Sequence, residues 1–125
     1  MRIDRRAVHL LAAWTVLVWA TRLRNVLDDP TLDAGATAWR VAWIVVFVAL
    51  ALLSLVAVRR RSATAPVLLR AFGVWSVAFW GVRSVQIAGA DHTAAFVAVH
   101  LVLALVSIAL AVWAWPRRDR RALAV

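Results

Sequence analysis

The sequence contains no cysteine, lysine, glutamate or tyrosine, and only four glycines and three prolines among its 125 residues. Without cysteine, the chain cannot form disulfides, use a thiol nucleophile or hold a metal or iron–sulfur centre through thiolates. No glycine-rich phosphate loop is present. All six acidic residues are aspartates, and none lies inside a long apolar stretch, so general acid–base catalysis lacks a buried carboxylate. The sequence therefore predicts a protein that is not an enzyme and that has no metal site and no cofactor.

What is abundant is apolar residues and arginine. Apolar residues make up 65% of the chain, whereas soluble domains contain roughly half. The fifteen arginines give a net charge of +9, but they lie in short clusters beside apolar stretches. This placement is typical of proteins that contact a lipid bilayer and anionic lipid rather than nucleic acid. We therefore expect a single transmembrane domain over residues 1–125. The frequent use of Ala, Val, Leu, Arg and Trp suggests a GC-rich bacterial genome. We therefore expect the protein in a bacterial cytoplasmic (inner) membrane.

Four apolar stretches are long enough to cross a bilayer as helices. They cover about 7–27, 36–58, 65–88 and 94–115, each close to the ~20 residues that span ~30 Å of hydrocarbon. The segments DDPTLDAGAT and AGADHTAA between them are predicted to be short turns. The middle connection, RRRSATAP, ends in Pro66, which suits the first turn of a helix. The sequence thus predicts an all-α integral membrane protein with four transmembrane helices.

The arginine clusters and the aspartates of the outer turns lie at opposite ends of these expected helices. Arginine clusters precede the first helix and follow the second and fourth, whereas the two outer turns carry aspartates. By the positive-inside rule, both termini and the middle connection are cytoplasmic. A signal peptide at the N-terminus is the alternative, but no small-residue cleavage site follows the apolar stretch. The clusters are Arg2, Arg5, Arg6; Arg59, Arg60, Arg61; and Arg117, Arg118, Arg120, Arg121, and the turn acids are Asp28, Asp29, Asp33 and Asp91.

One motif occurs twice in the chain. WTVLVWATRLRN starts at Trp14, and WSVAFWGVRSVQ follows 61 residues later, both fitting W-[ST]-x3-W-x2-R-x2-[NQ] without a gap. In the same register, the arginines at 59–60 match those at 120–121. We interpret the pattern as a tandem duplication of a two-helix hairpin, with repeat one over about 7–58 and repeat two over about 65–115. Such parallel repeats are related by a pseudo-twofold axis along the membrane normal.

The motif predicts a site for an anion near the outer surface. At 100° per residue its positions fall within an arc of about 140°, and each arginine follows a tryptophan by three residues, close enough for a guanidinium-over-indole contact. Two facing guanidiniums suit a phosphate or carboxylate, but they repel one another unless an anion or a turn aspartate lies between them. The candidate ligand-binding residues are Arg22, Arg83, Asn25, Gln86, Trp19, Trp80, Thr15, Ser76 and His100.

The same residues have a structural interpretation. Tryptophan and arginine near the ends of membrane helices commonly form an interfacial belt, in which the arginine side chain extends to the lipid headgroups. The sequence leaves both interpretations open. The repeated register of arginine, tryptophan and hydroxyl favours a site, because a belt does not require it.

Three functions remain compatible with the sequence. The first is a small transporter or channel component that binds an anion or lipid headgroup and acts as a homo-oligomer. The second is a non-catalytic accessory or assembly subunit that docks on a larger membrane complex through its tryptophan-rich stripes. The third is a haem-binding protein. It would require a dimer, because His9 and His100 are expected near opposite sides of the membrane and a bis-histidine haem needs both ligands at one depth.

Overall fold

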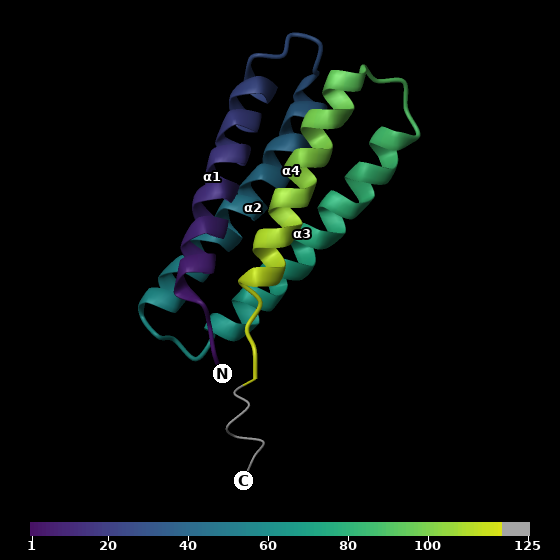
Figure 1. Cartoon of the computed structure of the whole chain (residues 1–125). Helices are drawn as coiled ribbons and strands as arrows, with labels where there is room; N and C mark the ends of the chain where they lie inside the picture. The colour runs from purple at the N-terminus through teal and green to yellow at the C-terminus, as the bar shows by residue number, and fades with distance from the viewer. Residues whose placement is uncertain (119–125) are drawn as a thin grey trace.

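The computed structural model describes residues 1–118, which form an up-and-down bundle of four helices (Figure 1). Helices α1 (Arg5–Leu27) and α2 (Ala34–Arg59) make the first hairpin, and α3 (Ala65–Ala88) and α4 (Ala94–Trp113) make the second. These bounds lie within two residues of the four predicted stretches at every helix end. The all-α, four-helix prediction is confirmed.

Side-chain caps determine where three of the helices begin. The carboxylate of Asp4 accepts hydrogen bonds from two backbone N–H groups in the first turn of α1. Asp33 caps α2 and Thr93 caps α4 in the same way. The cap at Asp33 begins α2 two residues earlier than predicted, whereas α4 begins at Ala94 as predicted. Pro66 lies in the first turn of α3, as expected.

Each helix packs against two neighbours. Helix α1 contacts α2 and α4, and α3 contacts the same two helices from the opposite corner. Helices α1 and α3 run in one direction and α2 and α4 in the other, so that each like-directed pair lies on a diagonal of the bundle (Figure 1). The N-terminus and the α2–α3 connection lie at one end of the bundle, and the outer connections 28–33 and 89–93 lie at the other. Toward the outer connections, α3 leans away from α1 in this view.

Large aliphatic side chains cover the outside of the bundle, and the interior combines aliphatic, aromatic, small and hydroxyl-bearing residues. Phe47 and Phe72 are both 1% exposed. Among the described residues, the buried polar ones are all hydroxyl-bearing: Thr15, Ser54, Ser76 and Ser107. By contrast, many valines and leucines are more than half exposed, including Leu17, Leu53, Val82, Val99 and Leu105. An apolar surface this extensive marks a contact with lipid or with another protein.

Three helices, α2, α3 and α4, are long and apolar enough to cross a membrane, whereas α1 is not among them. The difference has a local cause. The last turns of α1 contain Arg22, Arg24 and Asn25, which lower its mean hydropathy. The prediction of four spanning segments therefore holds for three helices by length and composition.

The middle connection turns at Arg61, which has a φ of 52° and so lies in the left-handed region. The N–H of Ser62 donates to the carbonyl of Ala57 (2.9 Å), and the N–H of Arg61 donates to that of Val58 (3.2 Å). This is the Schellman arrangement that closes a helix C-terminus, and glycine is the residue it normally uses. A side chain at this position carries steric strain.

We expect Arg61→Gly to raise the free energy of unfolding by roughly 0.5–1 kcal/mol, because glycine adopts a positive φ without that strain. Reversible denaturation of the protein in mixed detergent micelles measures the change. Arg60→Gly is the matched control, since it removes the same charge at a residue whose φ is −79°. An equal gain in stability for both variants would mean that the loss of positive charge, and not the relief of backbone strain, causes the stabilisation.

Candidate anion-binding pocket

A pocket of about 810 Å³ lies among the four helices, from the middle of the bundle toward the outer connections. Its lining comes from residues 18–26 of α1, 39–44 of α2, 75–86 of α3 and 99–103 of α4. The volume is in the range of sites for small organic ligands. At its deepest point the lining reaches Trp75, near the middle of α3.

Seven of the nine predicted residues line this one pocket. The two arginines, Arg22 and Arg83, are half-buried, and the amides of Asn25 and Gln86 are exposed beside them. The half-buried His100 comes from α4. The seven are Arg22, Asn25 and Trp19 from α1, Arg83, Gln86 and Trp80 from α3, and His100.

The two predicted hydroxyl residues lie elsewhere. Thr15 and Ser76 are 5% and 2% exposed and do not line the pocket. Each lies one helical turn before a motif tryptophan. Because helical side chains lean toward the helix N-terminus, the indoles of Trp19 and Trp80 extend over the level of these hydroxyls. In this structure Thr15 and Ser76 are residues of the core.

The motif tryptophans meet across the α1–α3 diagonal. The ring centroids of Trp19 and Trp80 are 6.1 Å apart, and Trp19 also stacks on Phe47 at 4.2 Å with an interplanar angle of 17°. The aromatic contacts of the described residues are all ring to ring, so the expected placement of a guanidinium over each indole is not found among them. Packing between rings therefore holds Trp19 and Trp80 in place.

Four further rings that were not predicted as site residues line the pocket. Trp43 of α2 stacks on Trp75 of α3, with centroids 4.9 Å apart and an interplanar angle of 25°. Trp39 stands edge-on to Trp43 at 5.7 Å and 78°, and Phe79 contacts Trp43 at 5.7 Å. The sequence contained a signal for this wall, since residues 39 and 43 are four apart and so share a helix face.

Arg40 of α2 adds a third guanidinium to the pocket lining, and sequence reasoning missed it. The positive charges of Arg83 and Arg40 both act on Arg22, so Arg22 is repelled from both sides of the pocket lining. Among the described residues, the one ion pair joins Arg24 to Asp28 at 3.9 Å, and both side chains are exposed. The expected neutralisation of Arg22 and Arg83 by a turn aspartate therefore does not occur through an ion pair within the described residues.

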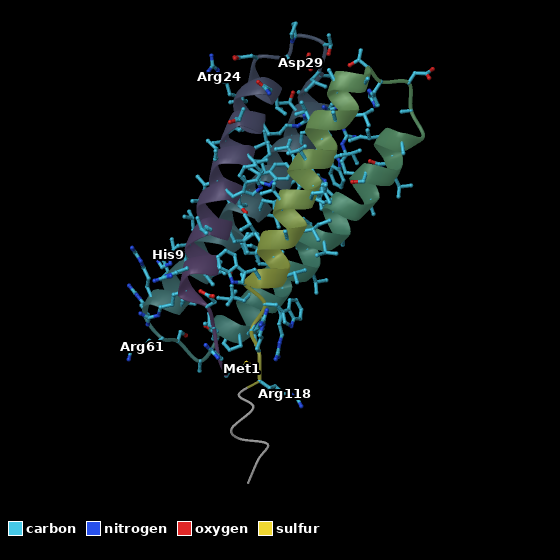
Figure 2. The ribbon with its side chains drawn as sticks, in the orientation of Figure 1. Met1, His9, Arg24, Asp29, Arg61 and Arg118 are labelled. Carbon is cyan, nitrogen blue, oxygen red and sulfur yellow. The ribbon has the colours of Figure 1, made fainter. Side chains whose placement is uncertain are left out.

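The turn aspartates have other hydrogen-bond partners. Asp29 accepts hydrogen bonds from the hydroxyl of Thr31 (2.6 Å) and from its backbone N–H (2.9 Å). These bonds, with a smaller contribution from the charge of Arg40, hold the pKa of Asp29 below its usual value. Asp33 is occupied as the cap of α2. Figure 2 shows Arg24 and Asp29 at the end of the bundle with the outer connections, with the Arg24 side chain directed away from the helices.

No family model, curated protein or solved structure matches this chain. The function of the pocket must therefore be argued from its geometry and chemistry.

Burial in α1 and α3 repeats in the 61-residue register of the motif. Six pairs of equivalent positions are buried in both helices, and they extend the match beyond the motif itself. They are Val8 and Leu69, Leu11 and Phe72, Ala12 and Gly73, Thr15 and Ser76, Trp19 and Trp80, and Val26 and Ile87.

Buried residues of α2 match buried residues of α4 that lie 60 positions later in the chain, instead of 61. Buried pairs in this register are Ile44 with Ala104, Phe47 with Ser107 and Ala51 with Ala111. The helix caps Asp33 and Thr93 are also 60 residues apart. The reason is that the second outer connection is one residue shorter, 89–93 against 28–33.

This shift changes the partner of His100. The ungapped register pairs it with Trp39, whereas the register of burial pairs it with Arg40, and both Arg40 and His100 line the pocket. The match of the arginines at 59–60 with those at 120–121 falls outside the described residues.

The histidines do not approach one another within the chain. His9 is exposed near the N-terminus, where its Nδ1 lies 2.6 Å from the carbonyl oxygen of Arg5 (Figure 2). His100 lines the pocket at the other end, and its Nδ1 donates to the carbonyl of Phe96 at 2.8 Å. One chain therefore cannot supply these two side chains to a single haem iron. Among the described residues, no group of three or more His, Asp or Glu is arranged for a metal ion.

Proposed function

We propose that this protein is a small anion-binding membrane protein of the transporter or channel-component class, acting as a homo-oligomer rather than as an enzyme. The observation that carries the proposal is that Arg22, Arg83 and Arg40 line one pocket, and that no carboxylate of the described residues forms an ion pair with them. Three guanidiniums at one site repel one another, so a shared anion stabilises the arrangement. The planar guanidinium binds phosphate or carboxylate through paired N–H donors. The ligand is an anion with this chemistry, either free or as the phosphate of a lipid headgroup.

We propose further that all four helices cross a bacterial inner membrane, with both termini in the cytoplasm. The apolar character of α2, α3 and α4 and the exposed aliphatic side chains support insertion. Helix α1 has 23 residues, enough to cross, and its polar last turns fit the outer interface. The arginine clusters near the termini and at the α2–α3 connection support the orientation, because basic residues concentrate on the cytoplasmic side.

The matching burial in the two hairpins supports an origin by duplication. The 61-residue register in α1 and α3 and the 60-residue register in α2 and α4 are what a copied hairpin with one residue fewer in its outer connection would give. On this proposal the two halves are parallel repeats around a pseudo-twofold axis that passes through the pocket. Arg22 then lies at the same depth in the membrane as Arg83.

The alternative is an accessory subunit that docks through its tryptophan-rich stripes, and two of the four motif tryptophans argue against it. Trp19 and Trp80 are only 6% and 5% exposed, so these indoles pack inside the bundle and are not available to a partner. The state of the protein purified from native membranes distinguishes the two proposals. A stable homo-oligomer supports the first, and recovery inside a larger complex supports the second.

The orientation predicts which positions an impermeant thiol reagent reaches from outside the cell. Since the chain has no cysteine, single cysteines at Ala34, Ala90 or Ser62 give unambiguous labels. We expect labelling at residues 34 and 90 in intact cells, and labelling at residue 62 only after the membrane is opened. Labelling of residue 62 in intact cells would contradict the proposed orientation.

Anion binding is tested by isothermal titration of the protein in micelles with two ligands of the same phosphate chemistry. Inorganic phosphate represents a free anion, and dihexanoyl phosphatidate represents a lipid headgroup. We expect saturable binding of at least one of them. Tighter binding of phosphate identifies a free-anion site, and tighter binding of phosphatidate identifies a headgroup site. If neither ligand binds saturably, the proposed function is wrong.

A further inference from the structure

The pocket is much larger than an inorganic anion requires. Along α3, its lining extends from Trp75 to Gln86, which is roughly 16 Å of helix, and the guanidinium-bearing Arg83 lies near one end of that length. A phosphate held by the arginines would occupy only that end. The remaining space, within a total of about 810 Å³, would be left to the rest of a larger ligand.

Aromatic rings wall the pocket both at the level of the arginines and deeper in the bundle. Six line the pocket: Trp19, Trp39, Trp43, Trp75, Phe79 and Trp80. Trp39 and Trp43 meet at 78° and form a corner, and Trp39 is 65% exposed, so part of its ring surface is uncovered. A flat ring placed in such a corner can stack on one indole and meet the other edge-on, which are the two geometries that aromatic pairs favour.

The charge of the arginines and the deeper rings favour one orientation of a bound ligand. The faces of the indoles carry negative electrostatic potential and repel an anionic group. The three arginines attract the same group at the end with the outer connections. A ligand with one anionic and one apolar end is therefore oriented with its charge outward and its apolar part toward Trp75.

We propose that the ligand is an organic anion with a flat aromatic body, a carboxylate or phosphate carried on an aryl ring system. This inference rests on the proposed anion-binding function and specifies its ligand class. Arg22, Arg83 and Arg40 hold the anionic group, and the ring lies against Trp43, with Trp39 closing the corner on the outer side.

The test compares ligands that share a carbon skeleton. In isothermal titrations of the protein in micelles, 2-naphthoate is compared with its saturated counterpart, decahydro-2-naphthoate, and with the uncharged 2-naphthalenemethanol. We expect 2-naphthoate to bind roughly threefold to tenfold tighter than decahydro-2-naphthoate, as expected for aromatic pairing beyond simple burial. The alcohol should bind more weakly than either carboxylate.

A substitution at Trp43 tests whether the preference for the aromatic carboxylate arises in this pocket. Trp43→Leu keeps an apolar side chain and removes the ring, so it should reduce the affinity ratio of the two carboxylates toward one. Trp113→Leu changes a tryptophan near the opposite end of the bundle and should leave the ratio unchanged. The wild-type ratio alone decides the matter if Trp43→Leu does not fold.

The inference and the proposed function fail in different ways. If decahydro-2-naphthoate binds as tightly as 2-naphthoate, or if phosphate or phosphatidate binds and 2-naphthoate does not, the ligand class is wrong but anion binding stands. If 2-naphthalenemethanol binds as tightly as 2-naphthoate, the arginines do not hold the charge, and the inference is overturned. If none of the carboxylates, phosphate or phosphatidate binds, both proposals are overturned.

Discussion

Replacing Arg22 or Arg83 with glutamine should weaken binding of phosphate or phosphatidate by roughly tenfold to a hundredfold, because each change removes charge-assisted hydrogen bonds from the anion. Both guanidiniums line the pocket and are half-buried. Lysine at either position should restore only part of the affinity, since it keeps the charge but loses the planar arrangement of donors. Isothermal titration of the micelle-solubilised variants measures these losses.

Arg24→Gln is the matched control for these substitutions. Arg24 is on the same turn of α1 as Arg22, but its side chain is 84% exposed and forms an ion pair with Asp28 outside the pocket. Its replacement should leave the affinity nearly unchanged. Equal losses for Arg22→Gln and Arg24→Gln would mean that the positive charge of this end of the bundle matters and the pocket does not.

Phe47→Ala should lower the free energy of unfolding by about 3–5 kcal/mol, through lost packing and the cavity that remains. Phe47 is 1% exposed and lies under three other rings: Trp19 at 4.2 Å, Phe79 at 5.0 Å and Trp75 at 5.8 Å. Because these rings form the aromatic wall, the variant should also bind aromatic anions less tightly. Reversible denaturation in mixed detergent micelles measures the stability.

Leu53→Ala on the same helix provides the contrast. Leu53 is 55% exposed, and on the proposed insertion it faces lipid in both the folded and the unfolded chain. Its truncation should change the free energy of unfolding by less than about 1 kcal/mol. A loss similar to that of Phe47→Ala would show that this face of α2 is covered by protein.

The helices could be predicted from the sequence because each apolar stretch is bounded by charge and turn residues. The start of α2, after the first outer connection, was predicted two residues too late. The segment DDPTLDAGAT was assigned to a turn on composition, whereas Asp33 caps a helix that already begins at Ala34. A capping aspartate followed by small residues is the local signal that defines this start.

Arg40 was missed for a different reason. With the 61-residue offset of the motif, Arg40 matches Leu101, so Arg40 has no polar equivalent in the second hairpin. The one-residue difference between the outer connections becomes visible only when burial and caps are known, and it pairs Arg40 with His100. The spacing of Trp39 and Trp43 indicated a shared helix face, but the stacking of Trp43 on Trp75 was beyond sequence reasoning, because it depends on how α2 packs against α3.

The motif itself was predictive in part. Its spacing identified residues that share a helix face, and six of its eight candidate residues line one pocket. It could not separate the pocket from the core beneath it, because Thr15 and Ser76 occupy the same face one turn lower. Depth along a helix face depends on how the neighbouring helices close around it, and a single sequence does not contain that information.

The central claim is that Arg22 and Arg83 serve one shared anion site, and the number of ligands bound per chain tests it most directly. The measurement is isothermal titration of the wild type and of both glutamine variants with the tighter of phosphate and dihexanoyl phosphatidate. A shared site predicts one ligand per chain in the wild type, and loss of that same binding in either variant. Two ligands per chain, with one binding event surviving unchanged in each variant, would mean that the arginines act separately at the lipid interface and would contradict the claim.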